Sequence, residues 1–221
     1  MSVREIIYGE NSPYEGFSKN PSRVDMQGWG SEHPVFKKVI DAINPSLIIE
    51  VGTWKGGSAL HMAKLVREKS LNAEIVCVDT WLGNWQHWAR KDGVGSVKDL
   101  ALVNGYPTLY YTFLNNVVCA GYEDIITPFS LPGYSAYKFF ENKKVKADIV
   151  YIDGDHEYDG VHLDLRTYWE VVKPGGVLVG DDINWPGVRR AVKELFEDKN
   201  IPMKIEDRKF VVRKSTAKAK K

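Results

Sequence analysis

The chain has 221 residues, 43% of them hydrophobic and 12% aromatic, which is enough apolar material for one domain with a buried core. The formal net charge is +1, and residues 213–221 carry five basic side chains and no acidic one, so residues 1–212 have a net charge of −4. This balance argues against a nucleic-acid or membrane partner. Two cysteines without metal-ligand spacing, and no apolar run of about 18 residues, favour a cytoplasmic protein.

Short apolar runs alternate along the chain with longer segments of helical spacing. Runs without polar alternation are typical of parallel strands that are covered on both faces, and the alternation predicts an α/β, Rossmann-like doubly wound, mostly parallel sheet. The C-terminal runs 203–205 and 210–212 predict an antiparallel hairpin at the edge of this sheet. The other predicted strands are residues 47–51, 74–79, 125–129, 147–153 and 176–180. The predicted helices are residues 58–67, 161–172 and 186–197.

The domain organisation follows from these elements. We expect an extended N-terminal arm at residues 1–32, one domain at residues 33–212, and a disordered basic tail at residues 213–221. The segment 81–122 is longer than an ordinary connection between strand and helix, which usually has about 2 to 6 residues. It is therefore predicted to be a partly helical, lid-like insertion.

Three tryptophans begin this insertion. Trp81, Trp85 and Trp88 recur at helical spacing, so on a helix they would form one aromatic stripe. Such a stripe is usually part of a hydrophobic core. The alternative is a lid that stacks on a bound ligand and excludes water from the reaction site.

The most informative motif runs from Glu50 to Ser58 (EVGTWKGGS), between a predicted strand and a predicted helix. Glycine at such a turn lets the backbone approach a ligand, and the first N–H groups of the helix face that ligand. Gly52, Gly56 and Gly57 depart from the G-x-G-x-x-G spacing of dinucleotide-binding proteins. The motif therefore predicts a ligand site but weighs against NAD; a turn that needs glycine only for packing is the alternative.

An acidic residue, Asp79, ends the second predicted strand, 27 residues after Gly52. A carboxylate at the carboxyl edge of the sheet can accept two hydrogen bonds from a ribose diol. The alternative is a helix cap or a solvated loop acid.

Four motifs together resemble those of class I S-adenosylmethionine-dependent methyltransferases, over residues 35–213. They are Glu50-x-Gly52 with Gly56-Gly57, Asp79, the IDGDH run at 152–156, and the PGG run at 174–176 before Asp181-Asp182. Among these enzymes the chain is most similar to small-molecule O-methyltransferases of the sugar or catechol type, many of which bind Mg²⁺. The resemblance implies a seven-stranded sheet and S-adenosylmethionine as the methyl donor. It places Glu50 and Gly52 near the amino-acid part of the donor and Asp79 on its ribose. The further candidate donor-binding residues are Thr53, Gly56, Gly57, Ser58, Thr80, Trp81 and, after the third predicted strand, Ser135.

Acidic residues follow two predicted strands and form a second candidate site. Neighbouring parallel strands end about 5 Å apart, so these carboxylates can converge on one point. They would repel one another unless a cation or protons offset them, and Mg²⁺ takes oxygen ligands. By resemblance, Asp153, Asp181 and Asp182 match the metal ligands of the family.

His156 follows Asp153 at the position where the catechol-type enzymes carry a lysine base. A neutral imidazole, with a usual pKa near 6.5, could accept a proton from a substrate hydroxyl. Asp155 is the alternative base, although it could instead cap the helix that begins near Asp159. His156 could likewise be a capping or solvated loop histidine.

The sequence thus predicts an S-adenosylmethionine-dependent O-methyltransferase that acts on a small sugar or phenolic molecule with the help of Mg²⁺. A metal-independent small-molecule methyltransferase and a non-catalytic binder of S-adenosylmethionine or a nucleotide are the alternatives. The expected partner is a small-molecule acceptor, without nucleic acid or membrane, and a homo-oligomer is left open.

Overall fold

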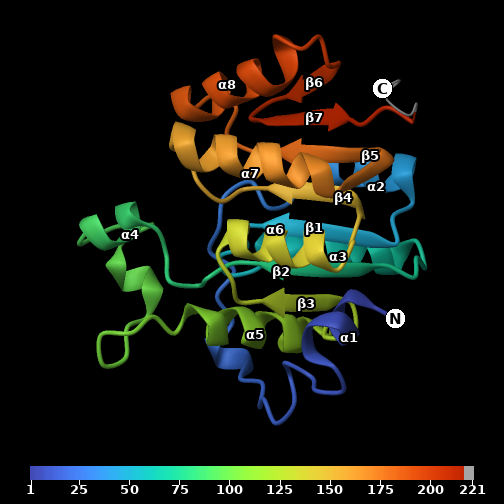
Figure 1. Cartoon of the computed structure of the whole chain (residues 1–221). Coiled ribbons are helices and arrows are strands. Elements are labelled where there is room, and N and C mark those ends of the chain that lie inside the picture. The colour runs from blue at the N-terminus through green and yellow to red at the C-terminus, as the bar shows by residue number, and fades with distance from the viewer. Residues whose placement is uncertain (217–221) are drawn as a thin grey trace.

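Seven strands form one mixed sheet with helices on both faces in the computed structural model, which describes residues 1–216 (Figure 1). The strands are β1 (Leu47–Val51), β2 (Glu74–Val78), β3 (Ile126–Phe129), β4 (Ala147–Ile152), β5 (Val172–Gly180), β6 (Met203–Glu206) and β7 (Lys209–Arg213). Their order is β3-β2-β1-β4-β5-β7-β6; the first five are parallel, and β7 is antiparallel to β5 and β6. This confirms the predicted doubly wound sheet with its antiparallel C-terminal hairpin.

Helices cover the two faces of the sheet through separate apolar clusters. One face carries α2 (Pro34–Ile43), α3 (Gly57–Glu68) and α5 (Leu109–Ala120). The other carries α6 (Gly133–Asn142), α7 (Tyr158–Val171) and α8 (Pro186–Val192), which continues as a π-helical turn, η3 (Lys193–Glu197). The remaining short elements are α1 (Val3–Tyr8), η1 (Pro21–Arg23), α4 (Trp85–Ala89) and η2 (Val97–Leu100).

The boundary between α7 and β5 differs from the prediction. Val172, expected in the helix, pairs with Ala147 as the first residue of β5. A register shift follows before Val177 pairs with Ile149. Pro174 has no N–H to donate and Gly175 has φ 82°, so this stretch cannot continue the helix. The extra residues of β5 are accommodated as a β-bulge between its pairs with Ala147 and Ile149.

The expected N-terminal arm is partly helical and lies along β3, the strand at one edge of the sheet (Figure 1). Its side chains bond to backbone carbonyl groups of that strand. Arg4 and Tyr14 donate to the carbonyl of Ile126 at 2.6 and 2.9 Å, and Tyr8 donates to the carbonyl of Pro128 at 2.8 Å. These bonds anchor the arm to the sheet.

The segment 81–122 contains α4, η2 and α5. Figure 1 shows that α4 stands away from the sheet, beyond the carboxyl ends of the parallel strands. Its position places the insertion over the edge at which open α/β sheets bind ligands.

The C-terminal segment continues the pairing of β7 beyond the strand. The Lys214 N–H bonds to the carbonyl of Gly176, and the Gly175 N–H bonds to the carbonyl of Lys214, both at 2.9 Å. The rest of the predicted disordered tail, residues 217–221, lies outside the described residues. Within residues 1–216, no helix is long and apolar enough to cross a membrane.

Candidate functional site

A cavity of about 710 Å³ opens at the carboxyl ends of the parallel strands. The turn after β1, the loops after β2 to β5 and the insertion all contribute to its wall. The size suits a cosubstrate together with a small acceptor, because ligand pockets of this class have about 300 to 1,000 Å³. Of the residues singled out in the sequence, the cavity wall includes Gly52, Thr53, Gly57, Ser58, Asp79, Thr80, Asp153, Asp155, His156 and Asp182.

The glycine turn after β1 is held against the loop after β4. Gly52 has φ 83°, and a Cβ there would lie 2.2 Å from the Asp153 carbonyl oxygen, so only glycine fits. The turn is also bound to Asp79, which accepts the N–H groups of Thr53 and Trp54 on one oxygen, each at 2.9 Å. Two loops that are separate in sequence thus form one rigid wall.

Asp79 also accepts the N–H of Trp81 on its other carboxylate oxygen at 2.7 Å. The Thr80 backbone also bonds to this carboxylate. Asp79 therefore holds the loops together and lies in the cavity wall.

Glu50 lies beneath the turn and is completely buried. Its carboxylate accepts hydrogen bonds from Ser58 and, at 3.1 Å, from Thr53. Burial raises the pKa of Glu50 to about 8. Glu50 therefore supports the turn from below and does not form part of the cavity wall.

Trp81 was predicted at the donor, and the structure places it elsewhere. Its side chain is 1% exposed, packs on Tyr110 and Phe113, and donates to the Trp54 carbonyl at 2.8 Å. The expected stripe does not form, because α4 begins only at Trp85 after its N-cap residue. Gly56 packs near α5 and Ser135 is exposed on α6, so neither is part of the cavity wall.

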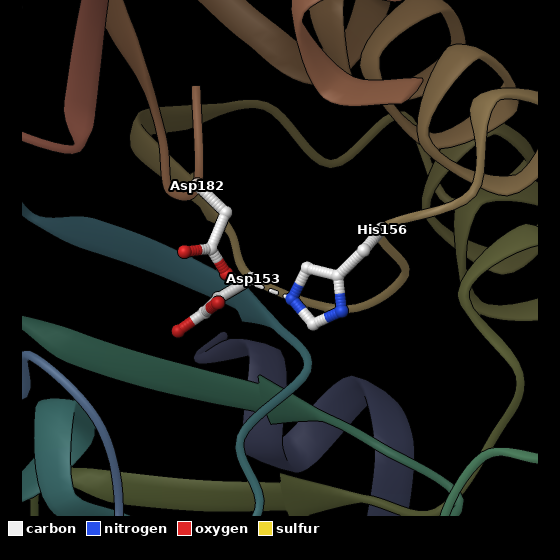
Figure 2. A group of neighbouring side chains, drawn as sticks. All are labelled: Asp153, His156 and Asp182. Carbon is white, nitrogen blue, oxygen red and sulfur yellow. Dashed lines mark ion pairs between the residues drawn. The ribbon is translucent and has the colours of Figure 1, made fainter. Parts of the chain in front are cut away.

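Asp153, His156 and Asp182 point toward one another at the ends of β4 and β5 (Figure 2). One ligand atom from each lies within 4.8 Å of the others, and His156 Nε2 is 2.8 Å from an Asp182 oxygen. This hydrogen bond raises the pKa of His156. The ring stacks on Trp185 at 4.8 Å, and within residues 1–216 its Nδ1 has no partner. Because a carboxylate only accepts, the Nε2–H of His156 donates to Asp182, and the lone pair of the neutral ring lies on Nδ1.

Asp181, predicted as a metal ligand, is turned away from the cavity. Its carboxylate forms ion pairs with the buried Lys209 and, at 2.9 Å, with Arg208. Burial alone would raise the pKa of Asp181, but the charge and hydrogen bond of Lys209 hold it below its usual value. The Tyr151 hydroxyl lies 3.0 Å from Asp181 and 2.7 Å from Asp153. Two protein cations thus supply the positive charge that Asp181 was expected to find in a metal.

Asp155 faces its own backbone. One of its oxygens accepts the N–H groups of His156 and Glu157, at 2.7 and 3.0 Å. Asp155 thus binds the loop before α7 and does not cap the helix, whose N-cap residue, Glu157, has no side-chain cap hydrogen bond.

Several cavity residues were not predicted. Arg208 comes from the turn between β6 and β7, a segment predicted only as a hairpin, and it pairs with Asp182 at 2.7 Å. Trp185 follows β5 and carried no spacing signal. Asp164 was detectable in principle, because it interrupts the apolar stripe of α7 between Val161 and Leu165.

The environment of Asp164 should make the free energy of unfolding depend on pH. Burial, followed by the charge of Asp155, raises the pKa of Asp164 to about 7. The folded protein must then ionise a buried acid above pH 7, whereas the unfolded chain ionises it near pH 4. Asp164→Asn should therefore be as stable as the wild type near pH 4 and more stable by up to about 4 kcal/mol at pH 8. Urea unfolding across this range measures it, and a pH-independent difference would contradict it.

Comparison with known proteins identifies the family of the chain and proteins of similar fold. Residues 49–183 match a family model described as a methyltransferase domain. The chain is 37% identical over 169 residues, 72% of its length, to the uncharacterized protein R132 of Acanthamoeba polyphaga mimivirus, and spans 64% of that relative. An O-methyltransferase from Bacillus cereus in complex with SAH has a TM-score of 0.61 at 13% identity, covering 90% of this chain and 93% of that one. CalS11, a TDP-rhamnose 3′-O-methyltransferase, has a TM-score of 0.59 at 17% identity, covering 81% and 76%. At these identities the structural matches establish the fold.

Proposed function

The chain belongs to the methyltransferase-domain family, and from this premise we propose that it transfers a methyl group from S-adenosylmethionine to a hydroxyl group of a small molecule of the sugar or phenolic type. The observation that carries the proposal is a single cavity with two chemically different ends. One end is the glycine turn with Asp79, and the other is the cluster of Asp153, His156 and Asp182. CalS11 supports a sugar hydroxyl as acceptor.

The glycine end is proposed to bind the methyl donor. Gly52 and Gly57 bring backbone within reach of the amino-acid part, and Asp79, in the cavity wall, accepts a ribose hydroxyl. The protein contributes alignment, since methyl transfer is a direct displacement that needs the acceptor oxygen in line with the donor sulfur.

The acidic end is proposed to hold the acceptor. As the acceptor oxygen bonds to the methyl carbon, the carbon–sulfur bond breaks with its electron pair remaining on sulfur. The hydroxyl proton passes to His156 Nδ1, while the Nε2–H stays bonded to Asp182, which stabilises the imidazolium that results. The stacked Trp185 fixes the ring plane.

The donor set of this cluster fits a divalent cation. Hard cations prefer oxygen, and Mg²⁺ commonly uses one or two carboxylates together with substrate and water oxygens. Asp153 and Asp182 would hold the ion, and His156 would stay free for the proton. When bound, such an ion would lower the pKa of the acceptor hydroxyl and orient it.

A metal-independent variant of the same reaction is the second candidate, and Arg208 favours it. The guanidinium lies in the cavity wall and bridges Asp181 and Asp182, at 2.9 and 2.7 Å. It could offset the acidic cluster without a metal, in which case the carboxylates only position the acceptor.

A methyl-transfer screen against sugars, nucleotide sugars, catechols and phenols, with EDTA or with Mg²⁺, tests both versions. We expect activity to fall at least about 100-fold in EDTA and to return with Mg²⁺. Asp153→Asn should lose activity to a similar extent, whereas Asp207→Asn, an exposed acid in the β6–β7 turn, should not. Full activity in EDTA would support the metal-independent version. Donor binding without transfer to any acceptor would point to a non-catalytic binder.

A further inference from the structure

The N-terminal arm and the insertion together line a part of the cavity that the proposed chemistry does not use. Gln27 and Trp29 come from the arm, and His87 and Arg90 come from the insertion. Trp54, in the glycine turn, lies between the two segments, because its ring stacks on His87 at 4.6 Å and is 6.0 Å from the ring of Trp29. These five side chains form one corner of the cavity, the arm corner.

The Gln27 amide brings a hydrogen-bond donor without a partner to the arm corner. Its Oε1 accepts the indole N–H of Trp54 at 2.9 Å, which fixes the orientation of the amide. Its Nε2 is buried, and within residues 1–216 no atom accepts a hydrogen bond from it. Burying an unsatisfied donor costs free energy, and an acceptor atom of a ligand would remove that cost.

Arg90 is the second donor of the arm corner. Arg208, the other arginine of the cavity wall, is paired with two acids, whereas Arg90 forms no ion pair within residues 1–216. The Arg90 guanidinium donates to the carbonyl of Val94 at 2.9 Å. A Cβ on Gly95 would lie 3.5 Å from an Arg90 nitrogen and 3.6 Å from the Trp29 ring. The cation and the ring therefore lie close to each other beside Gly95.

The acids of the cavity wall lie on other elements. They come from the loops after β2, β4 and β5 and from α7, and neither the arm nor the insertion contributes a described acid to the wall. A group that only accepts hydrogen bonds, a phosphate or a carboxylate, therefore finds two donors and no like charge in the arm corner. The planar guanidinium of arginine matches the geometry of both groups.

The arm corner is continuous with the acidic end, where the acceptor hydroxyl is proposed to react. Gly30 follows Trp29 in the chain, and a Cβ on it would lie 3.6 Å from the Arg208 Nε. Arg208 in turn bonds to Asp182 at 2.7 Å. One short stretch of the arm thus runs from the side of Arg90 to the acidic cluster, so a molecule whose hydroxyl lies at that cluster can extend a second group into the arm corner.

We propose that the arm corner binds an oxyanion, a phosphate or carboxylate group that the acceptor carries at a distance from the hydroxyl to be methylated. Arg90 and the Gln27 amide donate to this group, and Trp29 packs on the part of the acceptor next to it. The inference rests on the proposed function, because it names a class of acceptor for the same cavity. That class is the sugars or phenols with a negative charge.

Calorimetric titration with phenyl phosphate, benzoate and phenol measures the preference for an oxyanion. The titrations are made in EDTA, which removes metal ions that would bind phosphate, both with and without saturating S-adenosylhomocysteine. Wild type should bind the better of the two anions at least about 10-fold more tightly than phenol, because the uncharged compound lacks the charge-assisted hydrogen bonds. Which anion binds better distinguishes a phosphate from a carboxylate.

Three variants assign this preference to the arm corner. Arg90→Gln should reduce it to about 2-fold or less. Gln27→Glu keeps the acceptor for Trp54 and replaces the free amino group by a carboxylate oxygen, so repulsion should have the same effect. Lys91→Gln removes a positive charge from the next residue, which is exposed and outside the cavity wall, and should keep the wild-type preference.

Two results would overturn the proposal directly: equal affinity of wild type for phenol and both anions, or an unchanged preference in Arg90→Gln. A loss of affinity for S-adenosylhomocysteine of about 10-fold or more in Arg90→Gln would also overturn it, because Arg90 would then bind the carboxylate of the methyl donor. If wild type did not bind S-adenosylhomocysteine, the proposed function would be wrong, and the titrations without that compound would still test the oxyanion site.

Discussion

His156→Ala should lower the turnover number by about 10² to 10⁴ while leaving the affinity for S-adenosylmethionine nearly unchanged. The reason is that His156 lies in the cavity wall, where its Nε2–H bonds to Asp182 at 2.8 Å and leaves Nδ1 as the atom that can accept a proton. A general base acts on the transition state, and the donor is held at the other end of the cavity. Single-turnover kinetics together with donor titration would separate the two effects.

Two variants serve as controls for this result. His162→Ala removes a histidine from α7 whose ring contacts Tyr158 and does not line the cavity, so turnover should stay at the wild-type level. Asp155→Asn should have a modest effect through the start of α7. A large loss in Asp155→Asn with a nearly silent His156→Ala would assign the base to Asp155 and make the histidine structural.

Lys209→Met is expected to reduce the free energy of unfolding by about 3 to 5 kcal/mol. The Lys209 side chain is fully buried, forms an ion pair with Asp181 and donates to the Tyr151 hydroxyl at 2.8 Å. Removing it leaves the Asp181 carboxylate buried without its main counter-charge. The free-energy cost of that unpaired charge exceeds the net stabilisation that the ion pair provides. Equilibrium unfolding in urea measures the change.

The double variant Lys209→Met with Asp181→Asn should recover most of the lost stability, because the unpaired charge is removed as well. Lys204→Met, on the exposed side of the same hairpin, should change the unfolding free energy by no more than about 0.5 kcal/mol. If Lys209→Met alone stayed within this range, Asp181 would have another source of neutralisation.

The sheet could be predicted because its strands are unbroken apolar runs that are buried on both faces. The run at 47–51 coincides with β1, all five residues of which are buried. The convergence of Asp153 and Asp182 was also predictable, since they follow consecutive parallel strands, whose carboxyl ends can be neighbours.

The partners of the acids could not be predicted, because they depend on contacts between distant segments. Lys209 is 28 residues from Asp181 in a segment predicted only as a hairpin, yet the fold places it at the start of β7, beside that acid. The predicted tryptophan stripe does not form, and the reason lies in the local backbone. Gly83 has φ 71° and Asn84 caps α4, so Trp81 is not on the helix and turns into the core.

The hydrogen bonds between the N-terminal arm and β3 also affect the tendency of the protein to aggregate. An edge strand offers unpaired backbone groups as a template on which a strand of another molecule can add, the first step of edge-to-edge aggregation. Here Arg4 and Tyr14 occupy the carbonyl of Ile126, and Tyr8 occupies that of Pro128. An incoming strand would have to displace three side-chain hydrogen bonds before it formed its own. The arm therefore covers the edge of β3 and occupies its outward carbonyl groups. In a chain without the arm, β3 would be exposed to strand pairing with another molecule.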